Sequence, residues 1–181
     1  MKKQQNKIEP LKYTQSLILG FFVIACIFFI TQEDKCVQAQ AVFSPNSQTE
    51  VINLIHEAKE TIDVQMYILT SEQIALELAD ACKRKVQVRV IIEKRTEAYN
   101  LAKIVSALED SGVEVRWASE DYKLTHTKMM IIDSKKVFIG STNFSSSALL
   151  QNREASVILE GKIVQEFIRM FENDWDISTL V

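Results

Sequence analysis

The chain has 181 residues, of which 47% are hydrophobic, and its formal net charge is −3 at pH 7. This length and composition predict one folded domain with a substantial core and exclude a disordered, low-complexity chain. Residues 42–181 carry 16 basic and 21 acidic side chains, a net charge of −5. That balance excludes the strongly basic surface of a non-specific nucleic-acid binder, so any polyanionic ligand must be met by local positive charge.

The first 41 residues differ from the rest of the chain. Four lysines precede a stretch without charged residues, 13–32, which is long enough to cross a bilayer as a helix. We expect either a membrane anchor or a signal peptide with a candidate cleavage site at Ala39-Gln40-Ala41. Val23-Ile24-Ala25-Cys26 loosely resembles a lipoprotein box, but apolar residues follow the cysteine. Each alternative exports the domain 42–181, which is then membrane-anchored or secreted.

Cysteine and histidine usage argues against disulfide and metal sites. Among Cys26, Cys36 and Cys82, only Cys82 belongs to the predicted domain. The chain has two histidines, His56 and His126, and no C-x-x-C or H-E-x-x-H spacing. We therefore expect no internal disulfide framework, no structural zinc site and no cofactor.

Strand and helix patterns alternate along the domain. Apolar residues at helical spacing follow two capping boxes, Ser47-x-x-Glu50 and Thr70-x-x-Gln73, and Gly112 predicts the end of a third helix. The predicted helices cover 47–60, 70 through at least Ala81, 97–110 and 162–175. The predicted strands cover 41–44, 62–68, 86–92, 113–117, 127–132, 136–139 and 156–159.

This order of elements indicates an α/β protein. We expect an α-β-α sandwich with a mixed, largely parallel sheet. The sheet should be mixed because consecutive strands follow one another in the C-terminal half. In such folds ligands bind beyond the ends of the strands, so polar residues at strand ends are the candidate site.

His126 and Lys128 stand at the start of a strand that is otherwise Met and Ile. Residues two apart on a strand point to the same face, so these two side chains should lie together, with Thr127 and Met129 on the other face. Asp133 lies seven residues after His126, which by the same parity assigns it to the other face or to the turn.

Small polar residues follow the next strand. Gly140 allows the backbone to pass close to a ligand, and Ser141 and Asn143 are short hydrogen-bonding residues two positions apart. Glu154 stands at the opening of the strand 155–159 and is either a solvated strand end or a partner that orients a histidine.

These residues, H-x-K-x4-D, then G-S-x-N, then N-x-E, resemble the motif of the phospholipase D or HKD superfamily. Weaker similarity covers most of 42–176, including V-Q-M-Y at 64–67. The chain most resembles the short bacterial members with one motif, the small metal-independent endonucleases, and also their membrane-anchored mitochondrial relatives. The cysteine-rich zinc insertion of those relatives has no counterpart in the sequence, so their role in RNA processing is not carried over.

The resemblance implies roles for the motif residues. His126 would be a nucleophile that forms a phosphohistidine, and Lys128 and Asn143 would bind the substrate phosphate with support from Ser141. Glu154 would orient the histidine, and Asp133 would have a structural role. One chain offers one motif histidine, because His56 is expected on the surface of a helix. The second should come from a second chain, which implies a homodimer with a shared active site.

Three functions fit the sequence. The first is a metal-independent nuclease acting on DNA or RNA, and the second is a phospholipase D hydrolysing phosphatidyl lipids near the membrane. Short loops without an apolar insertion favour the nuclease, whereas the membrane-proximal segment favours the phospholipase. The third is a binding module without activity, which would not need the nucleophile. Lys94 and Arg95 follow a strand and either collect a polyanion at the rim of the site or form a solvated strand end. Lys83-Arg84-Lys85 is expected at a helix C-terminus.

Overall fold

The computed structural model describes residues 37–96 and 100–181. The chain divides into two units, Met1–Cys36 and Val37–Val181, and residues 1–36 of the predicted leader, including the candidate membrane span 13–32, lie outside the described residues. Within the described part, no helix is long and apolar enough to span a membrane. The first strand begins at Gln38, inside the segment that the sequence pattern assigns to the leader.

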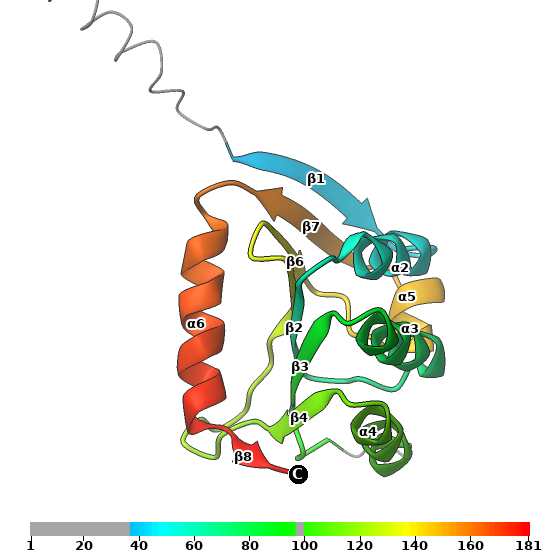
Figure 1. The fold of residues 1–181 in the computed structure, drawn as a ribbon. Helices are drawn as coiled ribbons and strands as arrows, with labels where there is room; N and C mark the ends of the chain where they lie inside the picture. Colours follow the sequence, from blue (N-terminus) through cyan, green and yellow to red (C-terminus); the bar gives the residue numbers. More distant parts are fainter. Residues whose placement is uncertain (1–36, 97–99) are drawn as a thin grey trace, which may run out of the picture. The chain divides into compact units, whose positions relative to one another are not determined.

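The second unit is built on one eight-stranded sheet in the order β1-β7-β6-β5-β2-β3-β4-β8. Helices α2 (Gln48–Glu57), α3 (Glu72–Lys83), α4 (Leu101–Asp110) and α5 (Ser146–Leu150) cover one face, and α6 (Val164–Ile177) covers the other, which confirms the predicted layers (Figure 1). The strands are β1 Gln38–Phe43, β2 Thr61–Met66, β3 Gln87–Ile92, β4 Glu114–Trp117, β5 Lys128–Ile132, β6 Lys136–Gly140, β7 Ala155–Glu160 and β8 Thr179–Leu180.

The sheet is mixed as predicted, but the prediction that it is largely parallel is wrong. Among the described strands, parallel pairing occurs only between β2 and β3 and between β3 and β4, while every other pair is antiparallel. The reason is connectivity. Between these neighbouring strands a helix returns the chain to the edge of the sheet from which it started, through α3 (Glu72–Lys83) and α4 (Leu101–Asp110). The short turn at Asp133–Lys135 instead forces β5 and β6 to run antiparallel.

Two helix starts differ from the predicted capping boxes. α2 (Gln48–Glu57) makes no side-chain cap at Ser47, whose hydroxyl donates to the Leu149 carbonyl at 3.4 Å instead. α3 is capped by Ser71, one residue after the predicted Thr70, and the Ser71 hydroxyl accepts from the Ile74 N–H at 3.4 Å. In both places tertiary contacts decide which hydroxyl faces the helix.

The remaining helix boundaries follow the sequence more closely. α4 ends before Gly112, whose φ of +89° fits the predicted stop. α6 (Val164–Ile177) buries Val164, Phe171 and Trp175 against β3, β5 and β6. Neither the short helix α5 (Ser146–Leu150) nor β8 was predicted, since each is too short for a periodic pattern.

Two apolar clusters fill the sheet's faces. Met130 and Ile132 of β5 pack on the side of α2–α5, while Met129 and Ile131 pack on the side of α6. This alternation confirms the predicted parity of β5. His126 and Lys128 share the parity of Met130, so they belong to the α2–α5 side of the sheet.

Candidate active site

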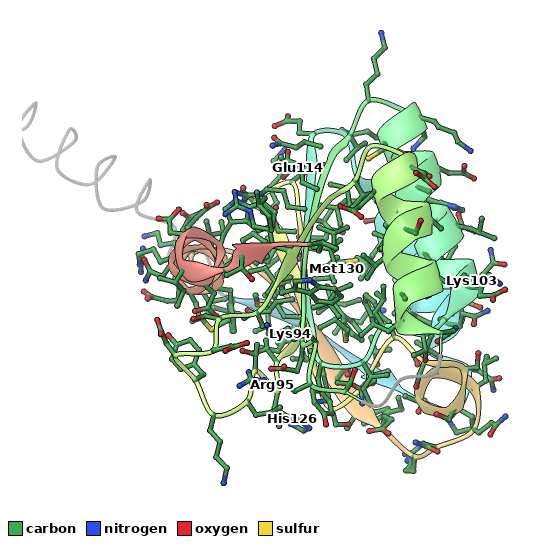
Figure 2. The ribbon with its side chains drawn as sticks, turned by 90° about the horizontal axis from the view of Figure 1, so that it is seen from below. Lys94, Arg95, Lys103, Glu114, His126 and Met130 are labelled. Atoms are coloured by element: carbon green, nitrogen blue, oxygen red, sulfur yellow. The ribbon has the colours of Figure 1, made fainter. Side chains whose placement is uncertain are left out.

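The candidate site lies at the edge of the sheet where β2, β3 and β4 end and β5 begins. The loop 118–127 leaves β4 and reaches β5, which pairs antiparallel with β2 and so starts at the end of that strand, where Met66 pairs with Lys128. Figure 2 shows Lys94, Arg95 and His126 at this edge and Glu114, the first residue of β4, at the opposite edge. The site is therefore assembled from strand ends, as the α/β pattern predicts.

His126 and Lys128 are neighbours, as predicted, although β5 begins only at Lys128 and His126 lies in the loop. The His126 ring is exposed, and the Lys128 Nζ lies 3.2 Å from its Nδ1 and 3.3 Å from its Nε2. The ammonium group thus lies close to both ring nitrogens. The contact places the cation of the site directly beside the candidate nucleophile.

Lys128 is the buried cation of the site, with 6% of its surface exposed. Burial lowers the pKa of its ammonium, although the nearby Glu154 carboxylate acts in the opposite direction. Its Nζ donates to the His126 carbonyl at 2.9 Å and lies 5.0 Å from the centre of the Tyr67 ring. Water stabilises a buried ammonium less than one at the surface, so a bound anion should stabilise the charged form of Lys128.

Tyr67 is a residue of the site to which the sequence analysis gave no role. It follows β2, and its ring centroid lies 4.3 Å from that of His126. Its backbone N–H donates to the Thr127 carbonyl at 2.8 Å. The ring therefore forms one wall against the imidazole and against Lys128.

Ser141 and Glu154 come together from β6 and β7. The Ser141 hydroxyl donates to Glu154 Oε2 at 2.5 Å and accepts from the Ala155 N–H at 3.1 Å, and Asn152 Nδ2 donates to Glu154 Oε1 at 3.2 Å. Within the described residues, no hydrogen bond joins Glu154 to His126. The family resemblance implies that Glu154 orients the histidine, but in a single chain the two described side chains make no direct hydrogen bond.

Asn143 and Gly140 depend on close backbone packing. Asn143 Oδ1 accepts from the Ile68 N–H at 3.3 Å, which directs its amide NH₂ group away from that backbone. A methyl group on Gly140 would lie 2.4 Å from the Ser156 Cα and 2.5 Å from the Ala155 carbonyl oxygen. Gly140 is therefore required for the close approach of β6 to β7 that brings Ser141 to Glu154.

Asp133 lies apart from His126, as the parity argument predicts. Its carboxylate accepts from the backbone N–H groups of Lys59, Glu60 and Thr61 at 2.7–3.1 Å, at the opposite end of β2 from the site. Burial raises the pKa of Asp133, but these three donors outweigh that effect and hold it below its ordinary value. Asp133 and Ser134 both have positive φ, which a tight hairpin turn requires.

We predict that Asp133→Asn lowers the free energy of unfolding by about 1–2 kcal/mol at pH 7. Asparagine tolerates the positive φ, so the change removes mainly the charge. Because the folded pKa is depressed, the wild-type advantage is present above the ordinary pKa of 3.8 and is lost as the pH falls through the folded value. Denaturant unfolding at pH 7 and at acid pH measures this. The matched control, Asp110→Asn on the exposed end of α4, should change the stability by less than about 0.5 kcal/mol.

Two expectations about other basic residues have different outcomes. The Lys83–Lys85 cluster lies at the C-terminus of α3 as predicted, with Lys83 paired to Asp80 at 2.7 Å. Arg95 is not available as a rim cation, because its guanidinium bonds Glu93 and three backbone carbonyls. Lys94 pairs with Glu120 at 2.5 Å on the surface. Glu93 directly follows the apolar strand β3 and is fully buried. A charged residue at that position is the sequence feature that could have indicated this network.

Potential metal ligands are scattered. Over residues 37–96 and 100–181, no group of three or more His, Cys, Asp or Glu side chains could hold a metal ion. His56 lies in the last turn of α2, where its Nε2 contacts Glu77 Oε2 at 2.7 Å. That turn leads into the start of β2, whereas His126 lies beyond the end of β2, so the two histidines occupy opposite ends of the sheet.

Comparison with known proteins agrees with this arrangement. The profile of the family described as "Cardiolipin synthase, PLD-like domain" matches residues 51–175. Mouse mitochondrial cardiolipin hydrolase is 28% identical over 134 residues, covering 74% of this chain and 60% of that protein. Phospholipase D of Rickettsia conorii is 30% identical over 125 residues, covering 69% and 60%. The chain thus spans less than two thirds of the length of these relatives.

A solved structure of a phospholipase D family member matches this chain along nearly its entire length. Nuc from Salmonella typhimurium, described as a phospholipase D family member, is 26% identical with a TM-score of 0.71, and the match covers 80% of this chain and 98% of that one. The profile match includes every residue of the H-x-K, G-S-x-N and N-x-E segments. The chain therefore belongs to the phospholipase D superfamily.

Proposed function

We propose that the chain is a metal-independent phosphodiesterase that acts through a phosphohistidine, and that its substrate is DNA or RNA, which it cuts as an endonuclease. The observation that carries the proposal is the pairing of an exposed imidazole, His126, with a buried ammonium, Lys128, 3.2 Å away. The imidazole supplies a nucleophile, and the ammonium supplies positive charge for the phosphoryl oxygens. The match to Nuc, which covers 98% of that chain, supports a catalytic unit of this size.

The reaction would proceed in two steps. In the first, a nitrogen of His126 attacks phosphorus, the P–O bond to the leaving group breaks, and a second imidazole protonates the leaving oxygen. In the second, that imidazole takes a proton from water, the water oxygen attacks phosphorus, and the P–N bond breaks. Lys128 and Asn143 would hold the phosphoryl oxygens in both steps. Ser141 and Glu154 would support these two side chains from β6 and β7.

The second imidazole requires a second chain. His56 lies at the far end of the sheet, and the chain has no other histidine. A homodimer with one shared site, containing His126 from each chain, meets this requirement. The exposure of His126 in the single chain supports this, because the ring is accessible to a partner.

A mixing experiment tests the shared site. Dimers formed from equal amounts of wild-type chain and His126→Asn chain should retain about one quarter of the wild-type activity, because only wild-type pairs contain two imidazoles. Chains that work independently would retain about one half. Differently tagged chains, co-expressed and assayed before and after separation of the mixed dimer, distinguish the two results. An active mixed dimer would contradict the shared site.

A second candidate function, phospholipase D activity on phosphatidyl lipids, is favoured by one observation. The loop before His126 carries Tyr122 and Leu124 with 48% and 40% of their surfaces exposed. Exposed apolar residues beside a phosphodiesterase site can enter the surface of a lipid layer. The sequence has no apolar insertion that could hold acyl chains, and two exposed side chains do not amount to one.

Product analysis with the full chain in EDTA decides between these functions. Single-stranded DNA, duplex DNA, RNA and phosphatidylcholine vesicles are offered separately. Cleaved nucleic acid with intact lipid is the expected result. Released choline with intact nucleic acid would establish the phospholipase, and activity only after adding a divalent ion would contradict the metal-independent mechanism.

We also propose that residues 1–41 export the domain as a membrane anchor through 13–32 or as a cleaved signal. This proposal rests on the charge and hydropathy pattern of the sequence. Mass spectrometry of the chain recovered from membrane and secreted fractions tests it. An intact chain in the cytoplasmic fraction alone would contradict export.

A further inference from the structure

We propose that Glu93 and Arg95 are positioning residues for His126. In this view the pair holds the loop 119–125 against the end of β3 and thereby sets where the imidazole stands. The inference rests on the proposed role of His126 as nucleophile. Figure 2 shows Arg95 and His126 at the same edge of the sheet.

Glu93 is the centre of the arrangement. It follows β3 directly and has no exposed surface. Its Oε1 accepts from Arg95 Nε at 2.6 Å and from the Arg95 backbone N–H at 2.9 Å, and its Oε2 accepts from Arg95 Nη2 at 2.7 Å. The same Oε2 also accepts from the N–H of Thr125, the residue before His126, at 2.9 Å. One buried carboxylate thus connects the arginine to the backbone next to the nucleophile.

Arg95 extends the connection along the loop. Its Nη1 donates to the carbonyls of Tyr122 and Lys123 at 2.9 Å and 3.1 Å, and its Nη2 donates to that of Ser119 at 3.4 Å. With the two bonds to Glu93, these contacts use the five N–H donors of a guanidinium group. A planar fork of fixed geometry is suited to hold several backbone positions at once, which a lysine cannot do.

The two ends of the loop are held separately. The Ala118 N–H donates to the Ile92 carbonyl at 2.9 Å, and the Thr127 carbonyl accepts from the Tyr67 N–H at 2.8 Å. Between these points, the contacts from Glu93 and Arg95 connect the loop to the sheet. Burial raises the pKa of Glu93, but the Arg95 guanidinium and the two backbone donors hold it below its ordinary value, so the carboxylate is charged at neutral pH.

This arrangement has a kinetic consequence. In-line attack on phosphorus requires the imidazole within a narrow range of positions, and a displacement of about 1 Å costs about 10²-fold in rate. Arg95→Ala should therefore lower kcat by about 10–100-fold while KM changes less than about threefold, because Arg95 directs its donors into the protein. A rim cation that attracts a polyanion would instead affect KM.

The test compares Arg95→Ala, Arg95→Lys and a matched control, Lys94→Ala, in the full chain. Lys94→Ala removes the same charge one residue away, where, among the residues that the structure describes, the side chain forms an ion pair with the surface residue Glu120. Lys94→Ala should keep wild-type kcat. Arg95→Lys keeps the charge but lacks the fork, so it should leave kcat low. The proposal would be overturned if Arg95→Lys had wild-type kcat and Arg95→Ala changed only KM.

A readout without turnover separates this proposal from the proposed function. The chain has two histidines, so selectively ¹³C-labelled His56 and His126 give two imidazole signals by NMR. Arg95→Ala should shift or broaden the His126 signal and leave that of His56 unchanged, and Lys94→Ala should change neither. An unchanged His126 signal in a folded Arg95→Ala chain would overturn the positioning role. A shifted signal together with an inactive wild-type chain would support the positioning role and refute the phosphodiesterase proposal.

Discussion

His126→Asn should reduce phosphodiesterase turnover by at least about 10³-fold while leaving the fold intact. Asparagine is polar and smaller, but it cannot form the covalent bond to phosphorus or transfer the proton. The ring of His126 is exposed. The backbone on either side of it is held by other residues, because the Thr125 N–H donates to Glu93 and the Thr127 carbonyl accepts from the Tyr67 N–H. The free energy of unfolding should therefore change by less than about 0.5 kcal/mol.

The control for this prediction is the other histidine of the chain. His56→Asn alters an exposed contact with Glu77 at the opposite end of the sheet and should leave turnover unchanged. Steady-state rates and thermal unfolding of both variants provide the comparison. Acid-quenched labelling with a ³²P substrate should trap a phosphoenzyme in the wild type and none in His126→Asn. Substantial turnover in His126→Asn would move the chemistry to another residue.

Gly140→Ala should lower the free energy of unfolding by about 3 kcal/mol and also reduce activity. The added methyl group would lie 2.4–2.5 Å from backbone atoms of β7, which is well inside contact distance. Backbone atoms cannot move aside as a flexible side chain can, so β6 and β7 must separate locally. That separation weakens the 2.5 Å bond between Ser141 and Glu154 and moves Asn143, which follows on the same segment.

Gly112→Ala is the matched control for this glycine. Gly112 has a φ of +89° and no atom within 4 Å of an added Cβ, so its substitution strains the backbone without a clash. We expect a loss of about 1–2 kcal/mol and normal kcat. Denaturant unfolding and kcat, measured where both variants are folded, separate loss of stability from damage to the site. A Gly140→Ala chain as stable as the wild type would refute the close-packing argument.

The local parts of the fold were predictable from the sequence, but the pairing of strands was not. Period-two and helical patterns place β3, β5 and α6 within a few residues. The pattern of β5 also indicated which of its side chains share a face. The pairing of β1 with β7, and the antiparallel outer strands, depend on contacts between distant segments that periodicity does not encode. The capping box at Ser47 was wrong for a similar reason, because the hydroxyl binds Leu149 from α5.

The site shows the same division. His126, Lys128, Ser141, Asn143 and Glu154 were predicted because they lie in short motifs whose spacing is a local property. Tyr67, Glu93 and Arg95 come from the ends of other strands and meet the motif only after the sheet forms. A charged residue directly after an apolar strand was a usable signal for Glu93, since a carboxylate in that position is buried only with partners.

The position of β1 determines when this strand can form during folding. β1 is the first described strand, yet its partner among the described strands is β7, and Ala41 aligns with Val157 across more than half of the chain. Pairing over such a sequence distance forms late, because a long loop must close first. Until β7 has been synthesised, Ala39-Gln40-Ala41 has no strand to join. If the leader is a cleaved signal, as proposed, a peptidase that cuts after Ala41 would have to act before β1 pairs with β7, because pairing incorporates that segment into the sheet.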